Sequence, residues 1–139
     1  MHDRPTISEL LDAIYIHLEK QVIPAVEADR RLYYQTLVAM HVLRAVGREI
    51  QTGREELKEE WRSLDFVQNL SAALPDDPDE AHEALTERNR KLCDEIKAGR
   101  YDYLPQRAAL FEHLLLTTRK QLEVSNPKFL EALVLEDGL

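Results

Sequence analysis

The sequence contains few of the residues that interrupt helices, and this scarcity limits the class of fold. Only 4 glycines and 6 prolines occur among its 139 residues, and they stand between segments of helical periodicity. No segment of useful length alternates apolar and polar residues as a half-buried strand does. We therefore predict an all-α fold, a single-domain helical bundle over residues 1–139, with about five long helices plus a short C-terminal helix.

Cysteine is equally scarce, and basic residues are outnumbered by acidic ones. The single thiol, Cys93, excludes an internal disulfide and a cysteine-based zinc cluster. Its place between apolar neighbours on a helix predicts a half-buried structural side chain. The 18 basic against 26 acidic residues give a net charge of -8, which argues against nucleic-acid binding through the phosphates.

Long apolar runs are missing as well. None approaches the roughly 20 residues of a membrane span, and no apolar signal-peptide core follows the polar residues 1–6. We therefore expect a cytoplasmic protein that makes no use of a membrane. Since 44% of the chain is hydrophobic, it still has enough apolar side chains for a packed core.

Caps and helix breakers place the first three helices. Thr6 and Glu9 have the spacing of a capping box, so a first helix should start there and reach about residue 22. Pro24 should end or kink it. A second helix is predicted over about residues 30–52, with Gly53 as its C-terminal cap, and a third over about residues 55–73.

Similar signals place the remaining helices. Asp77 should cap a fourth helix with Pro78 at its first position, and Gly99 should end it. A fifth helix is predicted over about residues 105–124, and Asn126 and Pro127 should begin the short sixth.

Helical spacing also predicts the core. The second helix should be the most buried, with an apolar face made of Leu32, Ala39, Met40, Leu43, Val46 and Ile50 and widened by Val42. Across the whole bundle, the predicted core residues are Leu11, Ile14, Leu18, Met40, Leu43, Trp61, Leu64, Leu92, Phe111 and Leu114.

The sequence contains no recognisable catalytic motif. Phosphate-binding and dinucleotide-binding glycine patterns are absent, as is the nucleophile elbow of hydrolases. None of the five histidines has a glutamate three residues before it, which a di-iron bundle requires. Asp79 and His82 come nearest, and their position suits an ordinary helix start better. We therefore expect no catalysis, metal or cofactor in this chain alone.

A basic stripe on the second helix is the best candidate for a binding surface. His41, Arg44 and Arg48 follow steps of three and four residues and so share one side of the helix. Apolar side chains flank the stripe, namely Tyr34, Leu37 and Val38. Arginine forks suit carboxylate and phosphate oxygens, so the stripe could dock an acidic partner or a phosphate-bearing ligand. The alternative is a solvated stripe that pairs with nearby acids.

The N-terminal residues Asp3 and Arg4 belong to the same hypothesis. By themselves they read as a helix-entry motif, in which Arg4 pairs with a neighbouring carboxylate and Thr6 caps the helix. Only a family resemblance makes Asp3 and Arg4 candidates for a binding role.

The chain resembles a bacterial family of small helical proteins that is formally a domain of unknown function. The residues that carry the resemblance run nearly the whole length of the chain: Asp3-Arg4-Pro5-Thr6, Glu9-Leu10-Leu11, Ala13-Ile14, Val22, Pro24-Ala25, Val46, Arg48-Glu49-Ile50, Asn89, Leu92, Ile96, Gly99, Val124 and Asn126-Pro127. Proteins similar to this family are encoded beside an aminoglycoside-phosphotransferase-like kinase and an acyl-CoA dehydrogenase. In levulinate catabolism, such a small protein works with the kinase that phosphorylates the 4-hydroxyl group of a 4-hydroxyacyl-CoA.

The resemblance implies a non-catalytic accessory subunit of a hydroxyacyl-CoA kinase. ATP and magnesium would then belong to the kinase, and no catalytic residue carries over to this chain. The expected contact residues are Asp3, Arg4, His41, Arg44 and Arg48. A standalone bundle that binds an acyl-CoA is the alternative, and a metal-dependent bundle enzyme is a third hypothesis. Formation of a homo-oligomer is left open.

Overall fold

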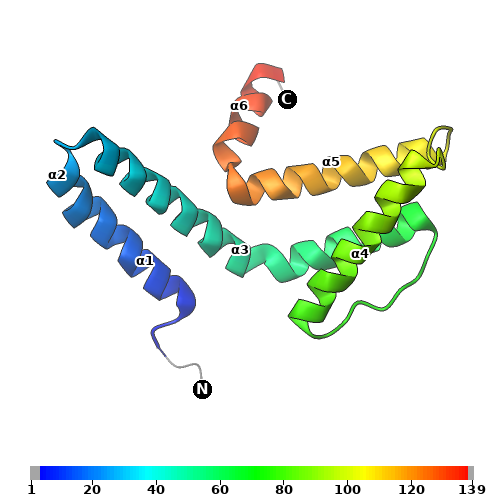
Figure 1. Cartoon of the computed structure of the whole chain (residues 1–139), viewed down its shortest axis with the longest axis horizontal. Helices are drawn as coiled ribbons and strands as arrows, with labels where there is room; N and C mark the ends of the chain where they lie inside the picture. Colours follow the sequence, from blue (N-terminus) through cyan, green and yellow to red (C-terminus); the bar gives the residue numbers. More distant parts are fainter. Residues whose placement is uncertain (1–3, 138–139) are drawn as a thin grey trace. The chain divides into compact units, whose positions relative to one another are not determined.

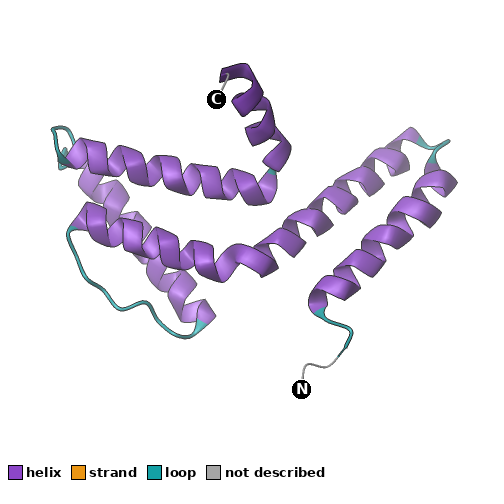
Figure 2. Cartoon of the chain, turned by 180° about the vertical axis from the view of Figure 1, so that it is seen from behind, coloured by secondary structure: helices purple, strands orange, loops and turns teal. Residues whose placement is uncertain are grey.

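The computed structural model describes residues 4–137, and within them helices are the only regular secondary structure, which confirms the all-α prediction (Figure 1). The helical elements in chain order are α1 (Ile7–His17), the π-helical segment η1 (Leu18–Val22), α2 (Ile23–Val26), α3 (Arg30–Gln68), α4 (Pro78–Lys97), α5 (Gln106–Ser125) and α6 (Pro127–Asp137). Figure 2 shows that only short loops and one longer connection, between α3 and α4, separate them. None of the helices in the described range is long and apolar enough to cross a membrane.

The first helical segment begins as the sequence predicts. The Thr6 side chain accepts a hydrogen bond from the Glu9 backbone N–H, and the Glu9 carboxylate accepts one from the Thr6 N–H, which completes the capping box. Pro24 does not end the helix at Val22. The backbone widens to a π-helix over η1, where Ile23 donates to the Leu18 carbonyl, and then continues to Val26. Such a π segment gives the proline ring room, because a regular α-helix would force the ring against the preceding turn.

One continuous helix, α3, replaces the second and third helices that the sequence predicts. The predicted cap at Gly53 is wrong, because Gly53 lies inside this 39-residue helix. A glycine costs a helix only about 1 kcal/mol relative to alanine, and the next proline, Pro75, lies beyond the end of the helix. The helix ends at Gln68 rather than near residue 73, because Asn69 adopts a left-handed φ of 52°. The Leu70 N–H then donates to the Asp65 carbonyl at 2.9 Å.

The C-terminal helices follow their predicted signals closely. Asp77 caps α4 by accepting hydrogen bonds from the N–H groups of Asp79 and Glu80, and Pro78 occupies the first turn. Gly99, with φ of 82°, ends the α4 region. The short sixth helix begins at Pro127 as predicted.

The chain divides into two compact units, residues 1–51 and residues 52–139. Its assignment to a single domain stays a prediction. Unit 1 contains α1, η1, α2 and the first part of α3, and Gly47 of α3 lies next to the Leu11 side chain of α1. Among its described residues only Met40 is buried.

Unit 2 holds the hydrophobic core of the described residues. Leu64 is fully buried, and it packs in a cluster that contains Leu64, Val67, Leu92, Tyr101 and Leu110. Trp61 is buried too. The predicted burial of Trp61, Leu64 and Leu92 is therefore confirmed.

Other core predictions need correction. Leu11, Leu18 and Leu43 are only half-buried, whereas Ile14, Phe111 and Leu114 are exposed. The apolar face predicted for the second helix is also largely uncovered, since Leu32, Val42, Val46 and Ile50 are exposed on α3. Cys93, predicted to be half-buried, is exposed on α4. For the exposed side chains the apolar spacing is helical, but no neighbouring element within the unit covers that side of the helix. Leu11 and Leu43, by contrast, lie between α1 and α3 and line the pocket there.

Candidate binding site

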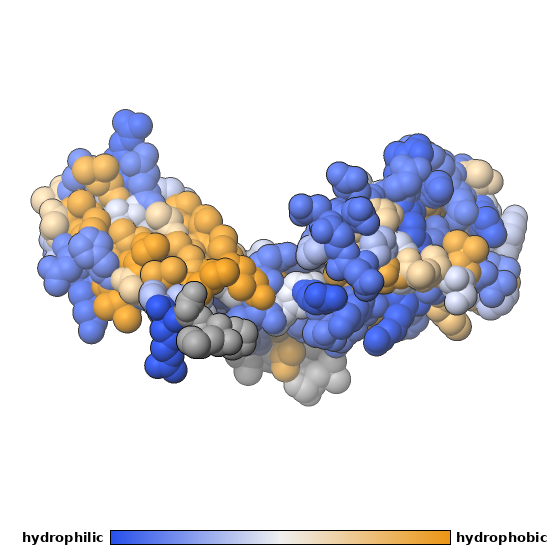
Figure 3. Space-filling view, turned by 90° about the horizontal axis from the view of Figure 1, so that it is seen from below, coloured by the Kyte–Doolittle hydropathy of each residue, from blue (hydrophilic) through white to orange (hydrophobic). Residues whose placement is uncertain are grey.

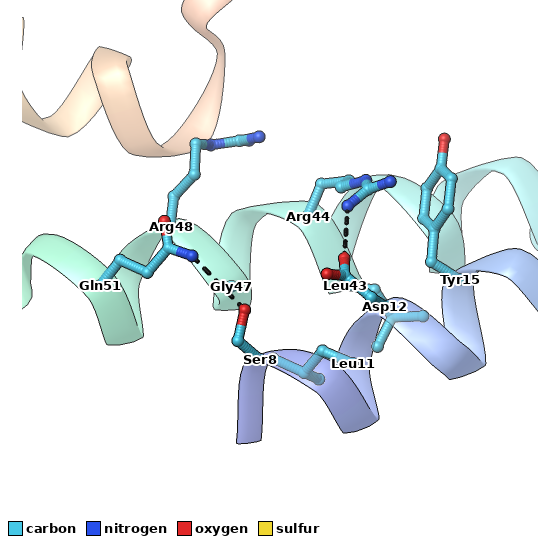
Figure 4. A pocket seen from close by; sticks show the side chains of 9 residues that line it. All are labelled: Ser8, Leu11, Asp12, Tyr15, Leu43, Arg44, Gly47, Arg48 and Gln51. Carbon is cyan, nitrogen blue, oxygen red and sulfur yellow. Dashed lines mark hydrogen bonds and ion pairs between the residues drawn. The ribbon is translucent and has the colours of Figure 1, made fainter. Parts of the chain in front are cut away.

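The helix pair of unit 1 encloses a small pocket along one side of the seam between α1 and α3. Its volume is about 200 Å³. The lining residues come from both helices (Figure 4): Ser8, Leu11, Asp12, Tyr15, Leu43, Arg44, Gly47, Arg48 and Gln51. Leu11, Leu43 and Gly47 form its floor at the seam. Polar side chains rise around them, and at one end the Gln51 amide donates to the Ser8 hydroxyl at 3.5 Å.

Arg44 is the best-positioned side chain of the pocket. Its Nη1 donates to Asp12 Oδ1 at 2.8 Å, and its guanidinium carbon lies 3.7 Å from the centre of the Tyr15 ring. Both partners of this ion pair are about half exposed, so the pair adds no more than about 1 kcal/mol to stability. Its main effect is orientation, because Asp12 and the ring fix the plane of the guanidinium. A guanidinium carries five N–H donors, and one carboxylate oxygen does not use them all.

The structure brings together only part of the residue set that the sequence proposes. Arg44 and Arg48 both line the pocket, and Arg48 also takes part in an interaction of its own. His41 is exposed on α3 but is not among the lining residues. Arg4 is exposed in the segment before α1 and does not line the pocket either. Asp3 lies outside the described residues.

The intramolecular pairing that was the alternative for Arg44 does occur, but with a different partner. The sequence suggested nearby acids, and the acid is Asp12, 32 residues earlier on the neighbouring helix. Tyr34, Leu37 and Val38, the predicted apolar flank, are all exposed. Arg44 is therefore both a paired residue and part of an accessible surface.

The pocket suits one small anionic group. A volume of about 200 Å³ is below the roughly 300–1,000 Å³ of pockets that enclose drug-sized ligands. Its two arginines match carboxylate or phosphate oxygens. Across the described part of the chain, no three His, Cys, Asp or Glu side chains cluster as metal ligands would. His82, the nearest sequence match to a metal site, instead has its Nδ1 2.8 Å from the Pro78 carbonyl oxygen.

Sequence reasoning missed a polar cluster in unit 2, centred on Arg88. Arg88 is buried on α4, where its Nε and Nη2 donate to Gln68 Oε1 at 3.2 and 2.9 Å. Its Nη2 also lies 2.9 Å from Asp65 Oδ1, and the guanidinium carbon is 4.4 Å from the centre of the Trp61 ring. Arg88 therefore joins α4 to α3 through an ion pair with Asp65, hydrogen bonds to Gln68 and a cation–π contact with Trp61.

A signal for this cluster was present in the sequence. Position 88 lies between Leu85 and Leu92 at steps of three and four residues, on the side of the helix that carries the predicted core residue Leu92. A charged residue on a buried face requires partners, because an unpaired buried charge is strongly destabilising. The sequence of α4 alone therefore predicts that Arg88 needs polar partners. It does not identify those partners on α3.

A buried histidine lies in the same unit. His113, on α5, is only 2% exposed, and its Nδ1 is 2.8 Å from the Ser63 hydroxyl oxygen. Burial lowers the pKa of His113 below its usual value, the nearby Arg88 lowers it further, and Glu60 opposes the shift. The neutral imidazole is therefore the favoured form in the folded protein. Asn89 donates to Glu60 at 3.0 Å and links α4 to α3.

Comparison with protein families gives one decisive match. Residues 26–129, which include α3, α4 and α5, match DUF6285, described as a domain of unknown function. The chain belongs to the DUF6285 family. The matched range contains Arg44, Arg48 and the Arg88 cluster, whereas Asp12 and Tyr15 precede it. No curated protein and no solved structure matches the chain.

Proposed function

We propose that this DUF6285 protein is a non-catalytic accessory subunit of an aminoglycoside-phosphotransferase-like kinase that acts on a hydroxyacyl-CoA. The side of α3 that carries His41, Arg44 and Arg48 would dock the kinase or the anionic groups of its substrate. The observation that carries the proposal is the oriented Arg44 guanidinium, held at the edge of an accessible pocket by Asp12 and Tyr15. The identity of the partner rests on the resemblance.

The composition of this side of α3 supports a protein interface. Interfaces are enriched in arginine and aromatic residues and combine an apolar centre with a polar rim. Here Tyr34, Leu37 and Val38 are exposed beside the basic stripe. An aromatic side chain and an arginine with a fixed plane are the kinds of residue that most often dominate binding energy.

The pocket supports an accessory role more than a self-sufficient binding site for an acyl-CoA. A coenzyme A molecule is larger than the drug-sized ligands that fill pockets of roughly 300–1,000 Å³, and this pocket offers about 200 Å³. It suits one phosphate of such a ligand, or one carboxylate of a partner protein. The kinase would supply the ATP site, the magnesium and the rest of the substrate site.

The decisive experiment is a charge swap at the Asp12–Arg44 pair. The protein is co-expressed with an aminoglycoside-phosphotransferase-like kinase, and complex formation is measured by pull-down and by titration of the purified components. We expect Arg44→Glu to weaken the complex at least about tenfold, or about 1.4 kcal/mol. The double variant Asp12→Arg, Arg44→Glu restores the ion pair within unit 1 with reversed polarity. The double variant should bind the kinase as weakly as the single variant does, because position 44 still presents a glutamate to the partner instead of an arginine.

The control and the contrary outcomes are clear. Arg119→Glu, at an exposed position on α5, changes the net charge equally and should leave the complex unchanged. If the swapped double variant regains full binding, Arg44 acts only within this chain and the proposed docking side is wrong. If the purified protein alone binds coenzyme A stoichiometrically by calorimetry and no kinase copurifies, the standalone ligand-binding alternative replaces the accessory role.

A further inference from the structure

The two arginines of the unit 1 pocket share it with one acid, and this balance of charges limits the ligand. The charged side chains among the lining residues are Arg44, Arg48 and Asp12, which together carry one positive charge. The attraction between an ion and the pocket grows in proportion to the charge of the ion, whereas the cost of removing water from the ion grows with the square of that charge. The pocket therefore favours a singly charged carboxylate over a doubly charged phosphate.

Arg44 has the geometry that a carboxylate requires. Its ion pair with Asp12 engages Nη1, and the Tyr15 ring lies against the face of the guanidinium. The opposite edge of the guanidinium, formed by Nε and Nη2, carries two parallel N–H groups, which match the two oxygens of a carboxylate. Because Asp12 and Tyr15 orient this edge in the free protein, little side-chain freedom is lost when a ligand binds.

The surroundings of Arg44 suit an acidic side chain of a protein. Leu11, Leu43 and Gly47 form an apolar floor in the pocket, against which the methylene groups of an aspartate or glutamate can pack. Leu37 is exposed two turns before Arg44, on the same line of α3 and about 10 Å away. Figure 3 shows further exposed apolar side chains over the helix pair of unit 1, as on surfaces that contact proteins.

We infer that the pocket binds the carboxylate of an aspartate or glutamate on a partner protein. The acid would lie on a partner helix that runs along α3, with an apolar residue two turns away against Leu37. The inference deepens the proposed accessory role and rests on it for the identity of the partner, the kinase. It assigns Arg44 to a carboxylate of the kinase rather than to a phosphate of the substrate.

The first test uses the isolated full chain and two small anions. Sodium acetate and inorganic phosphate are each titrated at equal ionic strength and about pH 8, where phosphate is mostly doubly charged. The carbon NMR signals of the arginine guanidinium groups report binding, and Arg44→Gln identifies the signal of Arg44 by its loss. The dissociation constant for acetate should be at least about threefold lower than that for phosphate.

Asp12→Asn is the matched variant for this test. It raises the charge of the pocket by one and should change the ratio of the two dissociation constants at least about threefold in favour of phosphate. Tighter binding of phosphate by the wild type, or a ratio that Asp12→Asn leaves unchanged, overturns the inference.

The second test locates the carboxylate in the complex with the kinase. A carbodiimide activates a carboxylate, which a primary amine in contact with it then attacks to form an amide bond. The double variant Asp12→Asn, Arg44→Lys places such an amine at position 44 and removes the acid of this chain that would compete. With kinase in saturating amounts, mass spectrometry should find a cross-link from position 44 to an aspartate or glutamate of the kinase. The control Asp12→Asn, Arg119→Lys places the amine at an exposed position on α5 and should give no such cross-link.

The outcomes separate this inference from the accessory role. A stable complex in which position 44 forms no cross-link to a kinase acid refutes the inference and leaves the accessory role in place. If the wild type forms no complex with the kinase, the accessory role fails, and the comparison of acetate with phosphate still decides which anion the pocket prefers.

Discussion

The burial of Leu64 gives the strongest quantitative prediction for stability. Leu64 has no exposed surface and lies in the unit 2 core against Val67, Leu92 and Tyr101. Leu64→Ala removes three carbons, each worth roughly 0.8 kcal/mol of burial, and leaves a cavity that adds to the loss. The expected total is about 3–5 kcal/mol, a large share of the roughly 5–15 kcal/mol that stabilises a typical domain.

A neighbour on the same helix supplies the matched control. Phe66 is a larger apolar residue only two positions away, but it is 77% exposed. Since full burial of such a side chain is worth about 1.5–3 kcal/mol, Phe66→Ala should reduce the free energy of unfolding by no more than roughly 0.7 kcal/mol. If the hydrophobicity of the removed side chain alone determined the loss of stability, Phe66→Ala would be the more destabilising variant.

The chain has one tryptophan, Trp61, which is buried in unit 2 and so serves as a local probe. Urea unfolding followed by Trp61 fluorescence, at a fixed protein concentration, measures both variants in the same unit. If Phe66→Ala costs as much as Leu64→Ala, or if Leu64→Ala costs less than about 1 kcal/mol, the burial assignment along this part of α3 is wrong.

Two further predictions concern buried polar groups of unit 2. Because burial lowers the pKa of His113 below its usual 6.5, the unfolded chain binds a proton there at a higher pH than the folded protein does. The folded state should therefore lose stability as the pH falls below about 6.5, and urea unfolding from pH 7.5 to 5 should show a smaller loss for His113→Gln; parallel curves would contradict this. Arg88→Met should cost about 3–5 kcal/mol, because it leaves the Asp65 carboxylate without its cation in a poorly solvated place. Adding Asp65→Asn should recover part of that loss in thermal unfolding, whereas strictly additive losses would show that the two charges are not coupled.

Local signals in the sequence determined the helical class and most helix ends. Thr6 with Glu9, Asp77 with Pro78, and Gly99 act through backbone groups within one turn, so their effect does not depend on distant partners. Where two local signals compete, the sequence is less decisive. Gly53 weakens α3 only slightly, and the strong helix formers on both sides carry the helix through it.

Only part of the candidate site could be predicted from the sequence. The spacing of Arg44 and Arg48 placed them on one side of a helix, and the structure has both at one pocket. The partners Asp12 and Tyr15 come from another helix, and nothing in the residues near Arg44 specifies them. The same holds for Arg88, whose position on a buried face was visible while Asp65 and Gln68 were not.

The sequence by itself determined which side of each helix is apolar, because that depends only on a period of about 3.6 residues. Only the tertiary structure decided which of these sides is covered, because burial depends on what a neighbouring element brings to it. On the second half of α3, Trp61 and Leu64 are buried in unit 2. On the first half, Val42, Val46 and Ile50 follow the same period and remain exposed, because α1 packs along a different side of the helix.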